Sequence, residues 1–198
     1  VYNRVQAGEQ MRLAVICFTE TGAQLADKIA CGLERSGWEA ECFCTDKYAG
    51  STGLKPSGEL RTWCKEQWEK SDCILFIGAA GIAVRAIAPY VTDKTRDPAV
   101  IVMGQDGRFV ISLLSGHIGG ANGFAAEIAE ITGGQAVITT ATDIAGKFAV
   151  DVFARKNGLL ISSMALAKEV SAAVLRGEKV GFFSDLPHVG PVPAELTP

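Results

Sequence analysis

The segment best equipped for chemistry is Ser115–Gly123, which reads Ser-Gly-His-Ile-Gly-Gly-Ala-Asn-Gly. Its four glycines in nine residues lose much conformational freedom on folding. Either a tight turn or a close approach of the backbone to a ligand explains them. His117 is one of two histidines, and the other, His188, lies in a proline-rich tail. Because imidazole titrates near neutral pH, His117 is the candidate acid–base group, with a purely structural histidine as the alternative.

Two further segments hold groups suited to an anionic ligand. Thr19-Glu-Thr-Gly22 places hydroxyls before a helical pattern, and plain capping of that helix is the alternative. Gly78-Ala-Ala-Gly81 resembles half of a dinucleotide-binding fingerprint without its third glycine. Its backbone N–H groups are expected to face an anion. Arg85 follows in an otherwise apolar helix, where its guanidinium needs a carboxylate partner from the protein or a ligand.

A fourth segment, Thr139-Thr-Ala-Thr-Asp143, gathers hydroxyls and a carboxylate after an apolar run. Asp143 either caps the next helix or orients a water molecule or His117.

These segments must be positioned by an α/β fold, because strand-like and helical patterns alternate along the chain. The apolar runs Leu13–Phe18 and Cys73–Ile77 are typical of strands buried on both faces. Two apolar runs within residues 100–114 flank Asp106-Gly107, which predicts an antiparallel hairpin. We therefore expect three layers and a mainly parallel sheet with this hairpin. Ligands of such folds bind at the carboxyl ends of the strands, where all four segments are expected.

The remaining segments are less regular. Asp46–Gly58 is rich in Gly, Ser, Pro and Lys and is expected to be a loop. Leu186–Pro198 contains four of the seven prolines and is not expected to form regular structure. Between the two, helices are expected near residues 146–157 and 164–175, and a last strand at 180–183.

Composition excludes several classes of protein. The 198 residues are 48% hydrophobic and 21% charged, which is enough apolar surface for a core and argues against global disorder. Basic residues number 19 against 22 acidic ones, so binding to nucleic acid by phosphate neutralisation is not expected. No apolar run is long enough to predict a membrane helix. The six cysteines form no Cys-x-x-Cys pair, which predicts reduced thiols in the cytoplasm and no zinc site.

Four longer runs stand in the order Gly81-Ile-Ala-Val-Arg-Ala-Ile-Ala-Pro89, Asp93-Lys-Thr-Arg-Asp-Pro98, Phe109-Val-Ile-Ser-Leu-Leu-Ser-Gly-His-Ile-Gly-Gly-Ala-Asn122 and Val137-Ile-Thr-Thr-Ala-Thr-Asp143. Their sequences, order and spacing resemble the CbiG-type proteins of cobalamin biosynthesis. The resemblance extends from about Leu13 to about Leu186, and its most specific part is Ser115–Asn122.

The resemblance implies a cobalt-precorrin-5A hydrolase of the anaerobic corrin pathway. Such an enzyme opens the δ-lactone at ring A and releases acetaldehyde, which leaves cobalt-precorrin-5B. The cobalt belongs to the substrate, so neither a protein-bound cofactor nor a metal site is implied. The expected location is the cytoplasm, and the expected partners are the tetrapyrrole substrate and other corrin-pathway enzymes. A homodimer is left open, and neither nucleic acid nor a membrane is expected.

The resemblance also implies a domain order. Residues 11–137 are expected to form an N-terminal α/β domain, and 138–198 a middle segment, complete or incomplete. The C-terminal domain of the family is absent from this sequence. Residues 1–10 are expected to be a leader or added residues outside the fold.

A corrinoid intermediate is a flat apolar macrocycle with many carboxylates, so an acidic protein must bind it through local donors. His117 is the expected acid–base residue, with Asp143 or Glu20 assisting, and the N–H groups of Gly119 and Gly120 are candidate oxyanion donors. The residues expected to bind the substrate are Gly78, Gly81, Arg85, Lys94, Ser115, Gly116, Gly119, Gly120, Asn122, Thr139 and Thr140. A non-catalytic tetrapyrrole-binding fragment and a nucleotide-binding α/β domain remain the alternatives.

Overall fold

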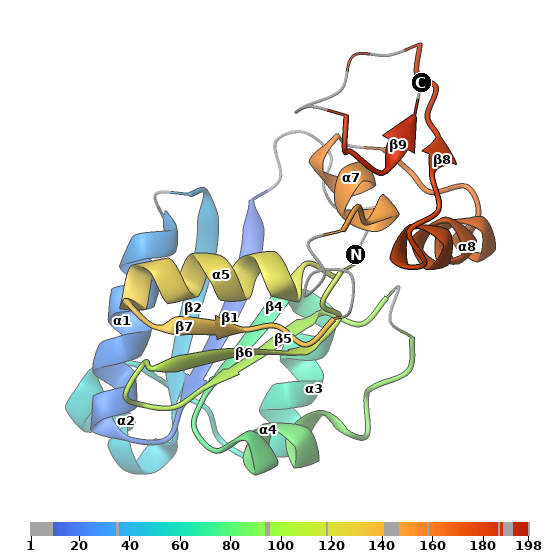
Figure 1. Cartoon of the computed structure of the whole chain (residues 1–198). Helices are drawn as coiled ribbons and strands as arrows, with labels where there is room; N and C mark the ends of the chain where they lie inside the picture. Colours follow the sequence, from blue (N-terminus) through green and yellow to red (C-terminus); the bar gives the residue numbers. More distant parts are fainter. Residues whose placement is uncertain are drawn as a thin grey trace. The chain divides into compact units, whose positions relative to one another are not determined.

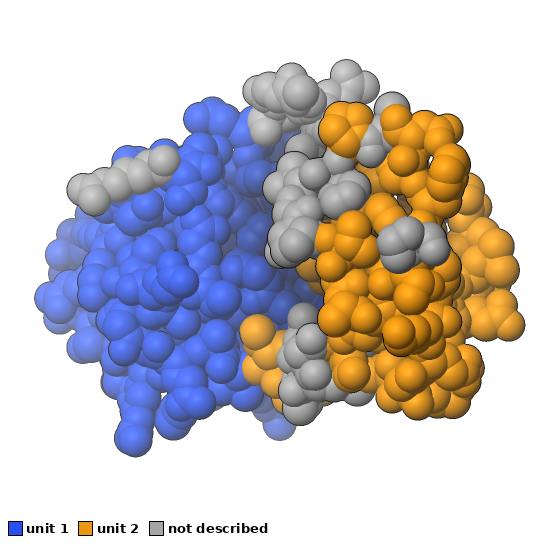
Figure 2. Space-filling view, turned by 45° about the horizontal axis from the view of Figure 1, so that its top comes forward, with its two compact units in different colours: residues 1–137 blue, residues 138–198 orange. Residues whose placement is uncertain are grey.

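The computed structural model describes residues 10–34, 36–93, 96–117, 119–140, 147–157, 159–185, 187 and 192–197. The chain divides into two compact units, residues 1–137 and 138–198, which Figure 2 colours separately.

The described residues of the first unit form a seven-stranded sheet with helices on both faces (Figure 1). Its elements are β1 (Met11–Cys17), α1 (Glu20–Glu34), β2 (Trp38–Cys44), α2 (Asp46–Thr52), β3 (Lys55–Pro56), α3 (Leu60–Lys70), β4 (Cys73–Ile77), α4 (Ala80–Ile87), β5 (Ala99–Met103), β6 (Phe109–Leu114), α5 (Ala121–Thr132) and β7 (Gln135–Val137). The strand order is β3-β2-β1-β4-β5-β6-β7, and β5 with β6 is the antiparallel pair. The expected mainly parallel sheet and its hairpin are confirmed.

The two faces of the sheet carry separate apolar cores. Leu13 and Val15 of β1 pack with α1 and α5, whereas Ala14 and Ile16 pack with α3 and α4. Successive side chains of a strand point to opposite faces, so one strand serves both cores. None of these four residues is more than 2% exposed. This burial on both faces is the physical reason for the unbroken apolar run in the sequence, and it gives the fold its three layers.

Strand direction defines two ends of the sheet. Cys17, Ile77 and Met103 are in register at the ends of β1, β4 and β5, and we call this the carboxyl end of the sheet. Since β6 is antiparallel, Leu114 at its finish pairs with Val100 at the start of β5. The loop that follows β6 therefore lies at the opposite end, which we call the amino end. Five strand residues separate the two ends, or roughly 16 Å.

The second unit is smaller. Its elements are α7 (Val150–Lys156), α8 (Met164–Leu175), β8 (Val180–Gly181) and β9 (Leu196–Thr197). Phe153 contacts Phe148 and Phe182, each with ring centroids 5.7 Å apart. Ser163 caps α8 by accepting a hydrogen bond from the Leu166 N–H at 3.4 Å. The two helices lie where the sequence predicts them. No helix among the described residues of either unit has the length and apolarity that crossing a membrane requires.

Two sequence predictions are wrong. Asp46–Gly58 is not a continuous loop, because it contains α2, which ends at Gly53 with φ 73°, and the short edge strand β3. Leu186–Pro198 is not wholly irregular, because β9 pairs in parallel with β8. A proline lacks a backbone N–H only at its own position. Two residues that lie between prolines can therefore still pair as a strand, although the proline content of the whole segment argues against regular structure. The last strand also ends earlier than expected, at Gly181.

Candidate functional site

The four segments singled out in the sequence do not meet at one place. Thr19–Gly22 follows β1 and Gly78–Gly81 follows β4, so both lie at the carboxyl end of the sheet. Ser115–Asn122 follows the antiparallel β6 and lies at the amino end. Glu20 is therefore placed away from His117, and its expected role as the assistant of His117 is wrong. Its Oε1 instead accepts a hydrogen bond of 2.7 Å from the Ser51 hydroxyl.

The loop around His117 is closed by its own backbone. Three N–H groups donate to loop carbonyls, from Gly120 to His117 at 3.0 Å, from Ala121 to Ser115 at 3.2 Å, and from Asn122 to Gly116 at 3.0 Å. These bonds use donors at the start of α5 that the sequence assigned to an anion. The Gly120 N–H in particular is engaged within the loop, so the expectation that it faces an oxyanion is wrong.

Close packing explains the glycines of this loop. A Cβ on Gly116 would lie 2.7 Å from Oδ1 of Asn122, and a Cβ on Gly119 would collide with Cβ of Ser115. Gly120 has φ 86°, which L side chains rarely adopt. Asn122 is 8% exposed, and its Oδ1 accepts a 2.6 Å hydrogen bond from the Ser112 hydroxyl. Asn122 therefore supports the loop from inside.

Ser115 carries backbone strain. Its φ of 57° is left-handed, and among the described residues it is the non-glycine residue with a positive φ. Such a conformation costs about 1–3 kcal/mol, which the surrounding contacts must offset. One of these contacts is the hydrogen bond of 3.1 Å from Ser115 Oγ to the carbonyl oxygen of Asp97.

Asp97 organises a turn beside this loop, and sequence reasoning missed it. Its carboxylate is 4% exposed and accepts hydrogen bonds from the Thr92 N–H at 2.9 Å, the Asp93 N–H at 3.0 Å and the Thr92 hydroxyl at 3.1 Å. The sequence signal for such a turn is general, because Asp side chains often accept hydrogen bonds from nearby backbone N–H groups. The turn and the His117 loop contact each other at the amino end of the sheet through the hydrogen bond from Ser115 to Asp97.

His117 is partly buried within this loop. It directly follows two residues that continue β6, and its carbonyl oxygen is fixed by the Gly120 N–H. A titratable side chain on a fixed backbone, with part of its surface reachable from solvent, suits proton transfer.

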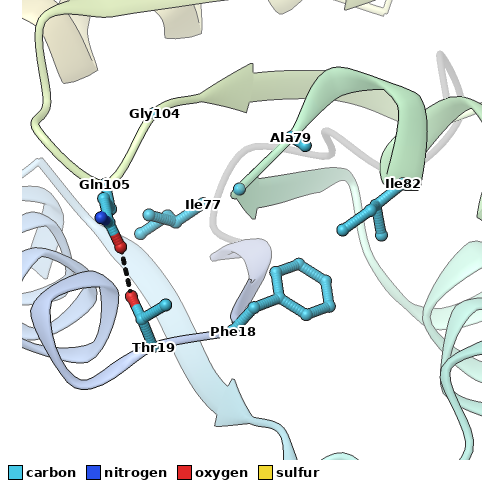
Figure 3. Close-up of a pocket in the computed structure, with 8 residues that line it drawn as sticks. Phe18, Thr19, Ile77, Ala79, Ile82, Gly104 and Gln105 are labelled. Carbon is cyan, nitrogen blue, oxygen red and sulfur yellow. Dashed lines mark hydrogen bonds between the residues drawn. The ribbon is translucent and has the colours of Figure 1, made fainter.

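The carboxyl end of the sheet holds a different kind of site. An open pocket of about 330 Å³ lies where β1 and β4 are neighbours; Figure 3 shows its lining, which comprises Phe18, Thr19, Ile77, Gly78, Ala79, Ile82, Gly104 and Gln105. The Thr19 hydroxyl donates to Oε1 of Gln105 at 2.7 Å and accepts from the Gly22 N–H at 3.0 Å. Thr19 thus caps α1, as the alternative prediction has it. The Gly78 N–H donates to the Met103 carbonyl at 2.8 Å and is not directed at an anion.

Arg85 also belongs to this end. Its side chain is exposed, and its Nη1 donates to the carbonyl oxygen of Gly81 at 3.1 Å, back toward the start of α4. It lines a surface groove of about 500 Å³ together with Glu59, Leu60 and Pro89, among others. The expected carboxylate partner is not needed for burial, because Arg85 lies on the exposed face of α4 and bonds to a backbone carbonyl; its expected role in substrate binding stays a prediction.

The remaining predicted residues are not placed with either group. Lys94 and Asp143 lie outside the described residues. Thr139 and Thr140 follow β7 in the chain and belong to the second unit. Over the described ranges, no group of three or more His, Cys, Asp or Glu side chains is arranged to hold a metal ion.

Comparison with known proteins identifies the family. Residues 62–143 match the model of the cobalamin synthesis G N-terminal region, and residues 148–197 match the cobalamin biosynthesis central region. The first match contains the Asp97 turn and the His117 loop but neither Thr19 nor Glu20.

Curated relatives agree with these matches. The cobalt-precorrin-5A hydrolase of Salmonella typhimurium is 36% identical over 174 residues, which are 87% of this chain and 48% of the relative. The enzyme of the same name from Priestia megaterium is 33% identical over 172 residues, covering 84% and 45%. The chain thus spans about half the length of the curated relatives it matches.

A crystal structure of a cobalamin biosynthesis protein G homologue from Sulfolobus solfataricus has the same fold. Its TM-score is 0.57 at 23% identity, and the alignment covers 93% of this chain and 52% of that one. Two family models and two relatives above 30% identity thus agree with the resemblance carried by the sequence runs. This chain belongs to the CbiG family of cobalamin-biosynthesis proteins and comprises its N-terminal and central regions.

Proposed function

We propose that this protein acts as a cobalt-precorrin-5A hydrolase in anaerobic cobalamin biosynthesis. The observation that carries the proposal is the 36% identity, over 87% of the chain, to a Salmonella protein of that name. The substrate class is a cobalt-containing tetrapyrrole. Its cobalt arrives with the substrate, so no cofactor of the protein is part of the proposal.

The proposed reaction has two stages. Water adds to the carbonyl carbon of the ring A lactone, and the C–O bond breaks to give a carboxylate and a hydroxyl. The hydroxyl then loses its proton, its carbon becomes a carbonyl, and the adjacent C–C bond breaks. The electron pair of that bond passes into the macrocycle, and acetaldehyde leaves. Both stages need a group that accepts and returns a proton.

We place this chemistry at the amino end of the sheet, with His117 as the acid–base residue. Three features support the placement: the partly buried imidazole, the strained Ser115 and the match of the family's N-terminal region to the loop and the Asp97 turn. Strained backbone that the surroundings hold in place is common at active sites. The Gly119 N–H is kept as an oxyanion donor. Asp143 lies outside the described residues, and its assisting role stays a prediction from the sequence.

The test measures two properties of the same protein. The chain is incubated with cobalt-precorrin-5A, acetaldehyde is assayed, and binding is followed by spectral titration, with the full-length gene product in parallel. Acetaldehyde release supports the proposal. Macrocycle binding by both proteins without acetaldehyde contradicts it and favours a binding module. The absence of both acetaldehyde and macrocycle binding also contradicts the proposal. Titration with a nucleotide then tests the alternative of a nucleotide-binding α/β domain. A cytoplasmic location, a homodimer and contacts with other corrin-pathway enzymes stay predictions.

A further inference from the structure

The described residues around Asp97 place a cation, Arg96, beside the proposed catalytic loop. Ser115 Oγ donates to the carbonyl oxygen of Asp97 at 3.1 Å, so the two segments are in direct contact. Arg96 immediately precedes Asp97, and His117 lies two residues after Ser115. The hydrogen bond therefore brings the backbone of Arg96 close to the backbone that carries His117.

The backbone of Arg96 is held by hydrogen bonds to described residues. The buried carboxylate of Asp97 accepts three hydrogen bonds from Thr92 and Asp93, and the N–H groups of Arg96 and Asp97 both donate to the Asp93 carbonyl, at 2.9 and 2.8 Å. A side chain on such a turn loses less freedom when it binds a ligand than one on a loose loop, because its backbone is already ordered.

The guanidinium of Arg96 is available to a ligand. The residue is exposed, and within the described part of the chain its side chain makes neither a hydrogen bond nor an ion pair. The carboxylate of Asp97 does not neutralise it, since that group is 4% exposed and faces the donors of Thr92 and Asp93. The charge of Arg96 is thus directed to solvent at the end of the sheet where the proposed chemistry takes place.

Three of the backbone donors at this end are already in use. The N–H groups of Gly120, Ala121 and Asn122 donate to carbonyl oxygens within the loop, so the start of α5 offers them to no ligand. The protein as a whole carries a net charge of −3 and repels a polyanion at long range. A charged side chain is therefore the stronger means of recognising a carboxylate here, and the planar fork of an arginine matches the two oxygens of a carboxylate.

We propose that Arg96 binds a peripheral carboxylate of the tetrapyrrole and holds the macrocycle against the His117 loop. This inference rests on the proposed function, which supplies the substrate. Arg96 is a binding residue in it and takes no part in proton transfer. The sequence predicts Lys94 as a substrate-binding residue; Lys94 lies outside the described residues, and the hydrogen bonds on either side of Arg96 are the reason for choosing Arg96.

The test compares two substitutions that remove the same charge at opposite ends of the sheet. Arg96→Gln removes it at the amino end. Arg108→Gln removes it from an exposed arginine in the β5–β6 hairpin at the carboxyl end, where Arg108 lies 5.1 Å from the centre of the Phe109 ring. Both variants and the unmodified protein are titrated with cobalt-precorrin-5A at low and high salt, and thermal melts verify folding.

Arg96→Gln is expected to raise the Kd by about tenfold or more, as for a lost charge-assisted hydrogen bond, and to reduce the salt dependence of binding. Arg108→Gln should leave both unchanged within twofold, and Arg96→Lys should recover part of the affinity. Equal weakening by Arg96→Gln and Arg108→Gln, or no weakening by Arg96→Gln, overturns the inference. If the unmodified protein neither binds nor converts cobalt-precorrin-5A, both the proposed function and the role of Arg96 are contradicted. If only the comparison of the variants fails, the role of Arg96 is contradicted and the proposed function is not.

Discussion

The two ends of the sheet differ in how their loops are built. At the carboxyl end, an open pocket is lined mostly by apolar groups, and one side-chain hydrogen bond, from Thr19 to Gln105, crosses it. At the amino end, a glycine-rich loop and a turn each form several internal hydrogen bonds, and the hydroxyl of the strained Ser115 joins the two by donating to the Asp97 carbonyl. Parallel sheets bind ligands at the carboxyl ends of their strands. Here the antiparallel β6 moves one such post-strand loop to the other end, so strand direction decides which end carries His117.

The largest expected effect comes from His117→Ala. In the full-length gene product, acetaldehyde release should fall by at least about 100-fold, the usual cost of losing an acid–base group, while the macrocycle still binds. His117→Asn should be equally poor if proton transfer is the role, and partly active if a hydrogen bond suffices. Turnover within a few-fold of the unmodified enzyme would remove His117 from the mechanism and shift attention to the carboxyl end.

The same glycine substitution should act in opposite directions at the two ends. Gly119→Ala forces a methyl group into Ser115 and should lower the free energy of unfolding by about 1–3 kcal/mol. Gly81→Ala meets the flexible Nη1 of Arg85 at 3.1 Å and should be neutral or stabilising by up to about 1 kcal/mol, because alanine favours a helix. Urea unfolding of both variants measures the difference. If both variants lose the same free energy of unfolding, the packing around Gly119 and around Gly81 does not differ.

Thiol labelling measures how often buried cysteines at the carboxyl end and at the amino end of the sheet become exposed to solvent. Burial raises the pKa of Cys17, at the carboxyl end of β1, and of Cys73, at the start of β4. All six cysteines are unpaired, and Cys31 is exposed. At mildly alkaline pH a thiol reagent should modify Cys31 first, and Cys17 and Cys73 slowly, as mass spectrometry of timed samples would show. Cys17 reacting much faster than Cys73 would identify the carboxyl end as the one that opens.

The buried thiol of Cys64 predicts a fall in the free energy of unfolding at high pH. Burial raises the pKa of Cys64 from 9.0 to about 11, so its contribution to stability is complete below pH 9 and is lost as the pH rises toward 11. The urea midpoint should drop over this range. The drop should be smaller in Cys64→Ala, and an identical drop would show that the thiol is not its source.

Arg85→Ala should have the smallest effect. Its guanidinium is exposed and bonds to a carbonyl of its own helix, so the free energy of unfolding should change by no more than about 0.5 kcal/mol. Because Arg85 lies at the carboxyl end, the affinity for cobalt-precorrin-5A should stay within about twofold. Spectral titration beside Arg96→Gln measures this. A weakening by Arg85→Ala as large as that by Arg96→Gln would transfer the binding site to the carboxyl end.

Several features of the fold could be predicted from the sequence because their causes are local. The unbroken apolar runs of β1 and β4 reflect strands that are buried on both faces, and Asp106-Gly107 indicates a turn by its own backbone preferences. The β3 and β9 strands could not be predicted this way. Each has two residues, and its pairing with β2 or β8 comes from tertiary contact and not from a periodic pattern.

The same division holds for the site. The sequence by itself determined that His117 stands among glycines after a strand, since residue types and spacing are enough for that. Which residues surround it was decided by the tertiary structure. Ser115 meets Asp97 across 18 positions of sequence, and Thr19 meets Gln105 across 86. Such contacts depend on the order and direction of strands, and the reversal of β6 separates Glu20 from His117 by the length of the sheet. A local pattern carries no record of strand direction, because a strand buried on both faces has the same apolar run whichever way it points.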